Sequence, residues 1–78
     1  MKSYALWEIQ TINMIRDFDN ERDALALVLR FIELNGPEVV NTLALNVEDE
    51  DGNISPIAHG QELAERARRE FSRERLTS

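Results

Sequence analysis

Two strand-like runs followed by a helix-like stripe occur twice in this chain, at an offset of about 40 residues. Ala5-Leu6 falls on Ala44-Leu45, and Ala24-Leu25 falls on Leu63-Ala64. In repeated folds each unit buries its apolar face against its neighbour, so a repeated order of elements limits the architecture strongly. We therefore expect an α+β fold of order ββαββα. It would have a four-stranded antiparallel sheet, two helices on one face and a candidate internal ββα duplication.

The 78 residues suit a single domain with one modest core. Its first ββα unit is expected over residues 1–36 and its second over residues 42–75, with a frayed tail at 76–78. Two hairpins can join edge to edge in more than one way, so the repeat leaves the order of the strands open.

The first unit opens with two short runs of aromatic and branched residues, Ser3–Ile9 and Met14–Phe18. Such runs are typical of strands, and the polar segment between them predicts a turn. Ile12 is poorly suited to a positive φ. Either Asn13 takes the left-handed position or the turn is longer than four residues.

A helix is expected to end each unit. Asn20 is placed to cap the first helix, and Asn35-Gly36-Pro37 predicts its end, because glycine allows a left-handed cap and proline prevents continuation. Glu38 to Asn41 is expected to form one extra turn. The second helix is expected from Gln61, just after Gly60, to about Arg73.

The second hairpin has the clearer strand signals. Its first strand alternates apolar with small or polar residues, the apolar members being Leu43, Leu45 and Val47. Asp51-Gly52 is a typical hairpin turn, and the fourth strand is expected from Asn53 to about Ala58. Pro56 lacks a backbone donor, so this strand should lie at a sheet edge or end early.

Strand alternation divides the predicted sheet into two faces. The residues expected beneath the helices are Ala5, Trp7, Ile9, Met14 and Phe18 from the first hairpin, and Leu43, Leu45, Val47, Ile54 and Ala58 from the second. The opposite face is expected to expose four apolar anchors, namely Tyr4, Leu6, Ile15 and Ile57. We interpret this face as a partner-binding surface, first of all a homodimer interface, because central apolar anchors supply most binding energy.

Charge and cysteine content narrow the classes of partner. The chain has 15 acidic and 9 basic residues, a net charge of −6 and no cysteine. This composition excludes a disulfide scaffold, a zinc-cysteine site and a generally basic nucleic-acid binder. No apolar run approaches the roughly 20 residues that cross a bilayer. We expect a small acidic bacterial-type protein of the cytoplasm that binds itself or another protein rather than nucleic acid or a membrane.

No residue pattern indicates catalysis, a cofactor or a metal. His59 is the single histidine, no cysteine is present as a nucleophile, and the three glycines are isolated turn residues. The acidic loop Glu48–Asn53 begins like an EF-hand loop, but Ile54 and Gly60 stand where that loop needs glycine and glutamate. We therefore expect a non-enzymatic protein. A small-ligand pocket beside Trp7 and His59 is kept as an alternative.

The second helix concentrates the arginines of the chain. Arg66, Arg69 and Arg73 share one side at helical spacing, which is an arrangement that can follow phosphates or dock a protein. Glu62 and Glu65 lie one turn before Arg66 and Arg69 and would neutralise part of this charge. The alternative function is therefore a regulator or antitoxin-like protein that contacts nucleic acid or a basic partner through this helix.

The opening segment resembles the start of HicB-type antitoxins. The likeness rests on Trp7-Glu8-Ile9, on Met14 to Phe18 and on the Ala-Leu-rich run from Asp23 to Leu27, and it covers about a third of the chain. The Pro-Gly segment that such antitoxins have between hairpin and helix is absent, and no DNA-binding ribbon or helix-turn-helix is expected after residue 60. The resemblance implies an acidic protein that neutralises a partner.

Overall fold

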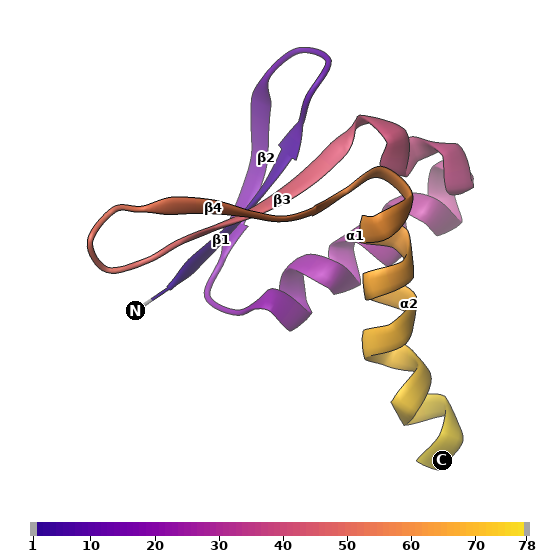
Figure 1. Ribbon diagram of the computed structural model, residues 1–78. Coiled ribbons are helices and arrows are strands. Elements are labelled where there is room, and N and C mark those ends of the chain that lie inside the picture. The colour runs from indigo at the N-terminus through magenta and orange to yellow at the C-terminus, as the bar shows by residue number, and fades with distance from the viewer. Residues whose placement is uncertain (1, 78) are drawn as a thin grey trace.

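Two antiparallel hairpins join through their first strands to form one sheet (Figure 1). The computed structural model describes residues 2–77, with side chains from residue 2 to residue 72. The strands are β1 (Ser3–Glu8), β2 (Asn13–Phe18), β3 (Leu43–Glu48) and β4 (Ile54–His59). Their order is β2-β1-β3-β4, and every neighbouring pair is antiparallel. The expected α+β fold of order ββαββα is confirmed, and Pro56 lies in an edge strand as predicted.

Two helices cover one face of this sheet, α1 (Glu21–Asn35) and α2 (Gly60–Thr77). Asn20 caps α1 by accepting a hydrogen bond of 2.8 Å from the Asp23 N–H. Gly36, at φ 92°, donates its N–H to the Ile32 carbonyl at 2.8 Å and ends the helix. The helix expected to end near Arg73 continues to Thr77, and Ser78 lies outside the described residues.

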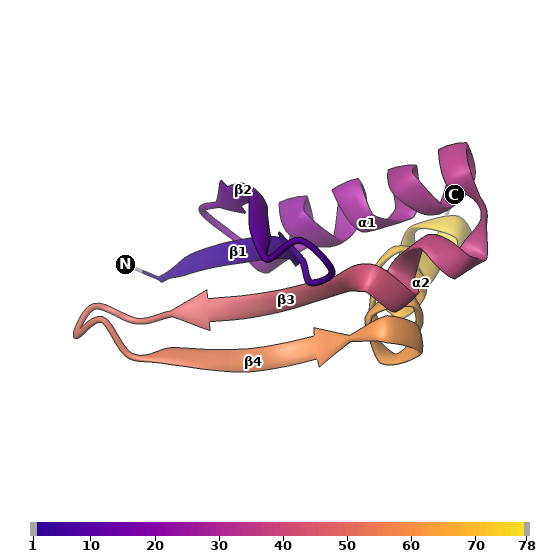
Figure 2. The ribbon, with the colours of Figure 1, turned by 90° about the horizontal axis from the view of Figure 1, so that it is seen from above.

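A short 3₁₀ helix, η1 (Pro37–Thr42), leads from α1 into β3 (Figure 2). It is the extra turn expected over Glu38 to Asn41. Val40 is fully buried, so this connection is part of the core rather than a surface loop.

The two ββα units match in their first strands and in the buried residues of their helices, whereas the second strands are shifted: Arg16 pairs with Leu6, and Ala58, 42 positions later, pairs with Leu45. A β-bulge interrupts the β1–β2 pairing after Leu6 and the β3–β4 pairing after Leu45, and these two residues face each other across β1 and β3. The buried helix residues are likewise matched, with Ala24, Leu25 and Val28 in α1 and Leu63, Ala64 and Ala67 in α2. Each is separated from its counterpart by the same sequence offset as Leu6 from Leu45. Matched bulges and helix contacts support a ββα duplication more directly than the sparse sequence identities do.

The predicted assignment of residues to sheet faces is wrong for the first hairpin except at Phe18, which packs against the core as predicted. The core centres on Leu6, Leu25, Leu45 and Leu63, all fully buried, whereas Ile9 and Met14 are 45% and 51% exposed. β1 has apolar residues at both odd and even positions, so alternation alone does not identify its inner face. The pairing of Leu6 with Leu45 places the even positions of β1 inward.

The bulges explain the remaining errors. Ile15 is the extra residue in β2, so Met14 and Phe18 lie on opposite faces although both numbers are even. Ile57 is the extra residue in β4, and it places Ile54 opposite Glu48, away from the helices and 65% exposed. Leu43, Leu45 and Ala58 are buried as predicted.

Candidate functional site

The four predicted partner-binding residues do not form one exposed patch. Leu6 is fully buried, and Tyr4 and Ile57 are partly buried against the core. Ile15 alone is clearly exposed, at 39%. The expectation that these side chains share the open face of the sheet is therefore wrong, because the register turns the even positions of β1 toward the helices.

A different set of residues forms the open face. Cross-strand pairing aligns one row of side chains over all four strands, in the order Met14, Trp7, Ala44 and His59. Direct neighbours in such a row lie close enough for their side chains to contact each other. The row places Trp7 and His59, the pair considered above as a ligand pocket, on one face with Ala44 between them.

The open face has an apolar end and an acidic end. The row that contains Trp7 has no carboxylate. The next row, farther from the β1–β2 turn, contains Asp17 opposite Ala5, and the row after it contains Glu48 opposite Ser3. Exposed apolar side chains of this face therefore lie mainly toward the β1–β2 turn, and Ile54 lies beside Glu48 at the acidic end.

The outer end of the first hairpin is the most apolar exposed surface of the described chain. Four of the six large apolar side chains that are strongly exposed in the described residues lie here: Ile9 (45%), Ile12 (77%), Met14 (51%) and Ile15 (39%). In Figure 1 this end of the hairpin points away from both helices. We call these four residues and Trp7 the hairpin patch. Residues 9–15 have no charged side chain, although 31% of the chain is charged.

The turn that presents the hairpin patch is organised by Glu8. Its carboxylate accepts the N–H groups of Gln10 and Thr11, each at 2.9 Å, and also the Thr11 hydroxyl. These bonds, first of all the one from the Thr11 hydroxyl, lower the pKa of Glu8. Ile12 has φ 57°, so the left-handed position falls on Ile12 and not on Asn13.

A branched residue in the left-handed region is an outlier, and the conformation costs roughly 1–2 kcal/mol relative to the right-handed one. Glycine or asparagine would fit this turn better. Ile12 is instead the most exposed of the large apolar side chains, at 77%, and the one residue other than glycine with positive φ among the described residues. Such strain is often associated with a functional site.

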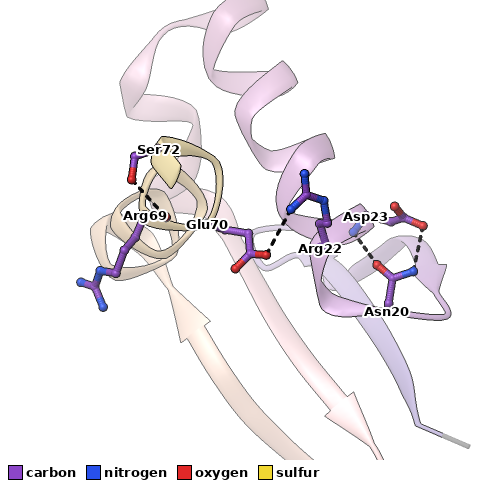
Figure 3. Close-up of polar contacts among 6 residues, drawn as sticks. All are labelled: Asn20, Arg22, Asp23, Arg69, Glu70 and Ser72. Carbon is purple, nitrogen blue, oxygen red and sulfur yellow. Dashed lines mark hydrogen bonds and ion pairs between the residues drawn. The ribbon is translucent and has the colours of Figure 1, made fainter. Parts of the chain in front are cut away.

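One arginine of the α2 stripe, Arg66, contacts α1. Arg66 forms two hydrogen bonds to the Glu21 carboxylate, from Nε at 2.8 Å and from a terminal nitrogen at 3.1 Å. This contact is the main reason that the pKa of Arg66 is raised. Arg69 is exposed and extends away from α1 (Figure 3), and the side chain of Arg73 lies outside the described residues. The expected neutralisation of Arg66 by Glu62 is replaced by a contact between the helices.

A second contact between the helices lies beside the first. Arg22 approaches Glu70 at 3.6 Å (Figure 3), and its guanidinium lies 4.7 Å from the centre of the Phe71 ring. The charged groups of this part of α2 therefore hold the two helices together.

The acidic β3–β4 turn is also organised by one carboxylate. Asp49 accepts the N–H groups of Asp51 and Asn53, both at 2.9 Å. Hydrogen bonding, chiefly from the Asn53 backbone, lowers the pKa of Asp49. Among the side chains that the structure describes, no three His, Cys, Asp or Glu residues are grouped in a way that could hold a metal ion.

Comparisons with protein-family models, with curated proteins and with solved structures found no match to this chain. Within residues 2–77, no helix is long and apolar enough to cross a membrane.

Proposed function

We propose that this chain is a non-enzymatic interaction protein that forms a homodimer through the open face of its sheet. The observation that supports this most directly is the concentration of exposed apolar side chains in the hairpin patch. Monomeric proteins expose single apolar residues everywhere, but a contiguous group on a projecting element is typical of a binding surface. Trp7 and Met14, neighbours in one row, are the proposed anchors.

The distribution of charge allows a second copy as the partner, because residues 9–15 of the hairpin patch carry no charged side chain. Two chains that each have a net charge of −6 repel each other, so they would meet where the surface is uncharged. A twofold axis through the apolar end would stack Trp7 and Met14 on their counterparts and keep Asp17 and Glu48 at the outer ends. This arrangement is isologous and therefore closes as a dimer.

The size of the chain is a further reason to expect self-association. A domain of this length buries only about 60% of the surface of its unfolded chain, so its own core gives modest stability. Covering the hairpin patch adds buried apolar area without a change in the fold. The absence of cysteine fits a reducing compartment, and we place the dimer in the cytoplasm.

The alternative of nucleic-acid binding through α2 has less support. A phosphate would have to compete with Glu21 for Arg66, because both hydrogen bonds of that pair lie between the helices. The observations therefore favour binding through the sheet.

Sedimentation velocity over a range of protein concentrations tests the proposal. Met14→Asp introduces a charge into the centre of the patch and should leave a folded monomer at concentrations at which the wild type is a dimer. The matched control is Leu34→Asp, since Leu34 is 72% exposed but lies in α1. A wild type that sediments as one chain at all concentrations would refute the dimer. Equal weakening by both variants would refute this location for the interface.

A further inference from the structure

A second surface lies on the other side of β2, where the edge of the sheet meets α1. A groove of about 330 Å³ runs between these elements. Its lining is Arg16 and Phe18 from β2, with Asp23, Ala26, Leu27 and Arg30 from α1. Phe18 and Leu27 are partly buried and give the groove an apolar floor.

Both arginines of this groove are free to bind an anion. Arg16 lies over the Phe18 ring, 5.6 Å from its centre, and among the side chains described, residues 2–72, it forms no ion pair with a carboxylate. Arg30 is exposed and also lacks an ion pair in the described part of the chain. Asp23, the one acid in the lining, already has its carboxylate bonded to the Asn20 amide at 3.1 Å. Two unpaired guanidinium groups in one groove are notable in a chain of net charge −6.

The edge of the sheet favours an extended occupant. β2 is an outer strand, and its outward N–H and C=O groups have no strand beside them. The other outer strand, β4, contains Pro56 and therefore lacks one donor. β2 has no proline, so it is the better edge for adding a strand.

We propose that β2 and α1 bind an extended acidic segment of a partner protein. The segment would pair with the edge of β2, as in strand addition, while its carboxylates contact Arg16 and Arg30. Alternate side chains of a strand point to the same side. Acidic residues at every second position would therefore all face the groove. This surface is distinct from the hairpin patch, because Arg16 lies opposite the inward-facing Leu6.

The test is a titration of ¹⁵N-labelled protein, followed by NMR, with a peptide of four Val-Glu repeats. Peptides of four Val-Lys repeats, four Val-Gln repeats and eight glutamates are run in parallel. Binding of the Val-Glu peptide should shift the amide signals of residues 13–18 and 23–30 and leave those of Ala44 and His59 unchanged. The Val-Lys and Val-Gln peptides should bind more weakly. The glutamate peptide lacks β-branched residues, so it should form an extended strand less readily and also bind more weakly.

Variants locate the contact. Arg16→Gln and Arg30→Gln should each weaken binding by about two- to fivefold, as expected for partly exposed ion pairs. Arg68→Gln is the matched control, because Arg68 is exposed on α2 and lies outside this groove. Equal weakening by Arg68→Gln would overturn the location, since it would indicate a general charge effect.

Other outcomes would also refute the proposal. If the Val-Glu peptide does not bind at millimolar concentration, the edge of β2 is not a site of strand addition. Equal affinity for the glutamate peptide would show recognition of negative charge alone. Shifts in residues 16–18 and 23–30, outside the hairpin patch, that appear on raising the protein concentration without peptide would identify a second copy as the occupant. The sedimentation result with Met14→Asp is read separately, so failure here leaves the homodimer proposal standing.

Discussion

Leu6 lies directly opposite Leu45 across the β1–β3 pair, and each residue occupies the same position in its own ββα unit. Both side chains are fully buried. They therefore connect the two halves at the centre of the sheet, beneath both helices.

Truncating either leucine should destabilise the whole domain. Leu6→Ala or Leu45→Ala is expected to lower the free energy of unfolding by about 2–5 kcal/mol, the usual range for a buried leucine. Urea denaturation followed by circular dichroism measures the change. Ile54→Ala, at a position 65% exposed, is the control and should change stability by less than about 1 kcal/mol. A loss confined to one hairpin would contradict a shared core.

Replacing Ile12 should stabilise the monomer and weaken the dimer. Ile12→Asn suits the left-handed conformation and is expected to raise the free energy of unfolding by about 0.5–1 kcal/mol. Thermal unfolding at low protein concentration measures this gain, and sedimentation measures the loss of association. Ile54→Asn, also at an exposed isoleucine but not at positive φ, should give no gain in stability. Unchanged stability in Ile12→Asn would show that the turn is not strained.

The Glu21–Arg66 pair should contribute a small coupling energy between the helices. Its side chains are 27% and 47% exposed, so solvent screens the contact, and a double-mutant cycle with Glu21→Gln and Arg66→Gln should give about 0.5–1 kcal/mol. The coupling should fall in 1 M salt. Arg66→Gln should not change the result of a binding titration with a nucleic-acid oligomer. A marked drop in nucleic-acid affinity in Arg66→Gln would support the alternative function, nucleic-acid binding through α2.

Acid should loosen the two hairpin turns. The folded-state pKa values of Glu8 and Asp49 are lowered by hydrogen bonds, so each carboxylate adds stability above its ordinary pKa. That stability is lost as the pH falls through the lowered value. Glu8→Gln should therefore lower the urea midpoint at pH 7 and reduce its decline between about pH 5 and pH 3.

The control for the pH experiment is Glu33→Gln. Glu33 is exposed in α1, and its carboxylate makes no hydrogen bond within the described residues. This variant should keep the pH profile of the wild type. A Glu8→Gln profile parallel to that of the wild type would show that the Glu8 bonds do not stabilise the turn.

Local signals in the sequence predicted the elements well. Asn20 and Gly36 mark the ends of α1 because capping depends on residues close in the chain, and Asp51-Gly52 marks the second turn for the same reason. The repeat predicted the order of the elements, and the structure confirms it. These features need no knowledge of distant contacts.

Local sequence patterns could not predict which strand side chains face the helices. A single bulge residue, Ile15 or Ile57, reverses the parity of the rest of its strand, and no residue type marks either position. In β1, apolar residues at both odd and even positions led the candidate site to be placed around Leu6 instead of Trp7. The contact of Arg66 with Glu21 was missed because it joins residues 45 positions apart. One signal for the hairpin patch is present in the sequence, because Ile12 is poorly suited to the turn in which it lies.

Fluorescence of Trp7, the single tryptophan, tests the central claim most directly. Trp7 lies in the open-face row beside Met14, so its indole should lose contact with water when two copies associate. As the concentration passes through the range in which the mass doubles, we expect the emission maximum to move to shorter wavelength and acrylamide quenching to decrease. Met14→Asp should abolish both changes. A doubled mass with unchanged Trp7 emission and quenching would contradict the proposed interface.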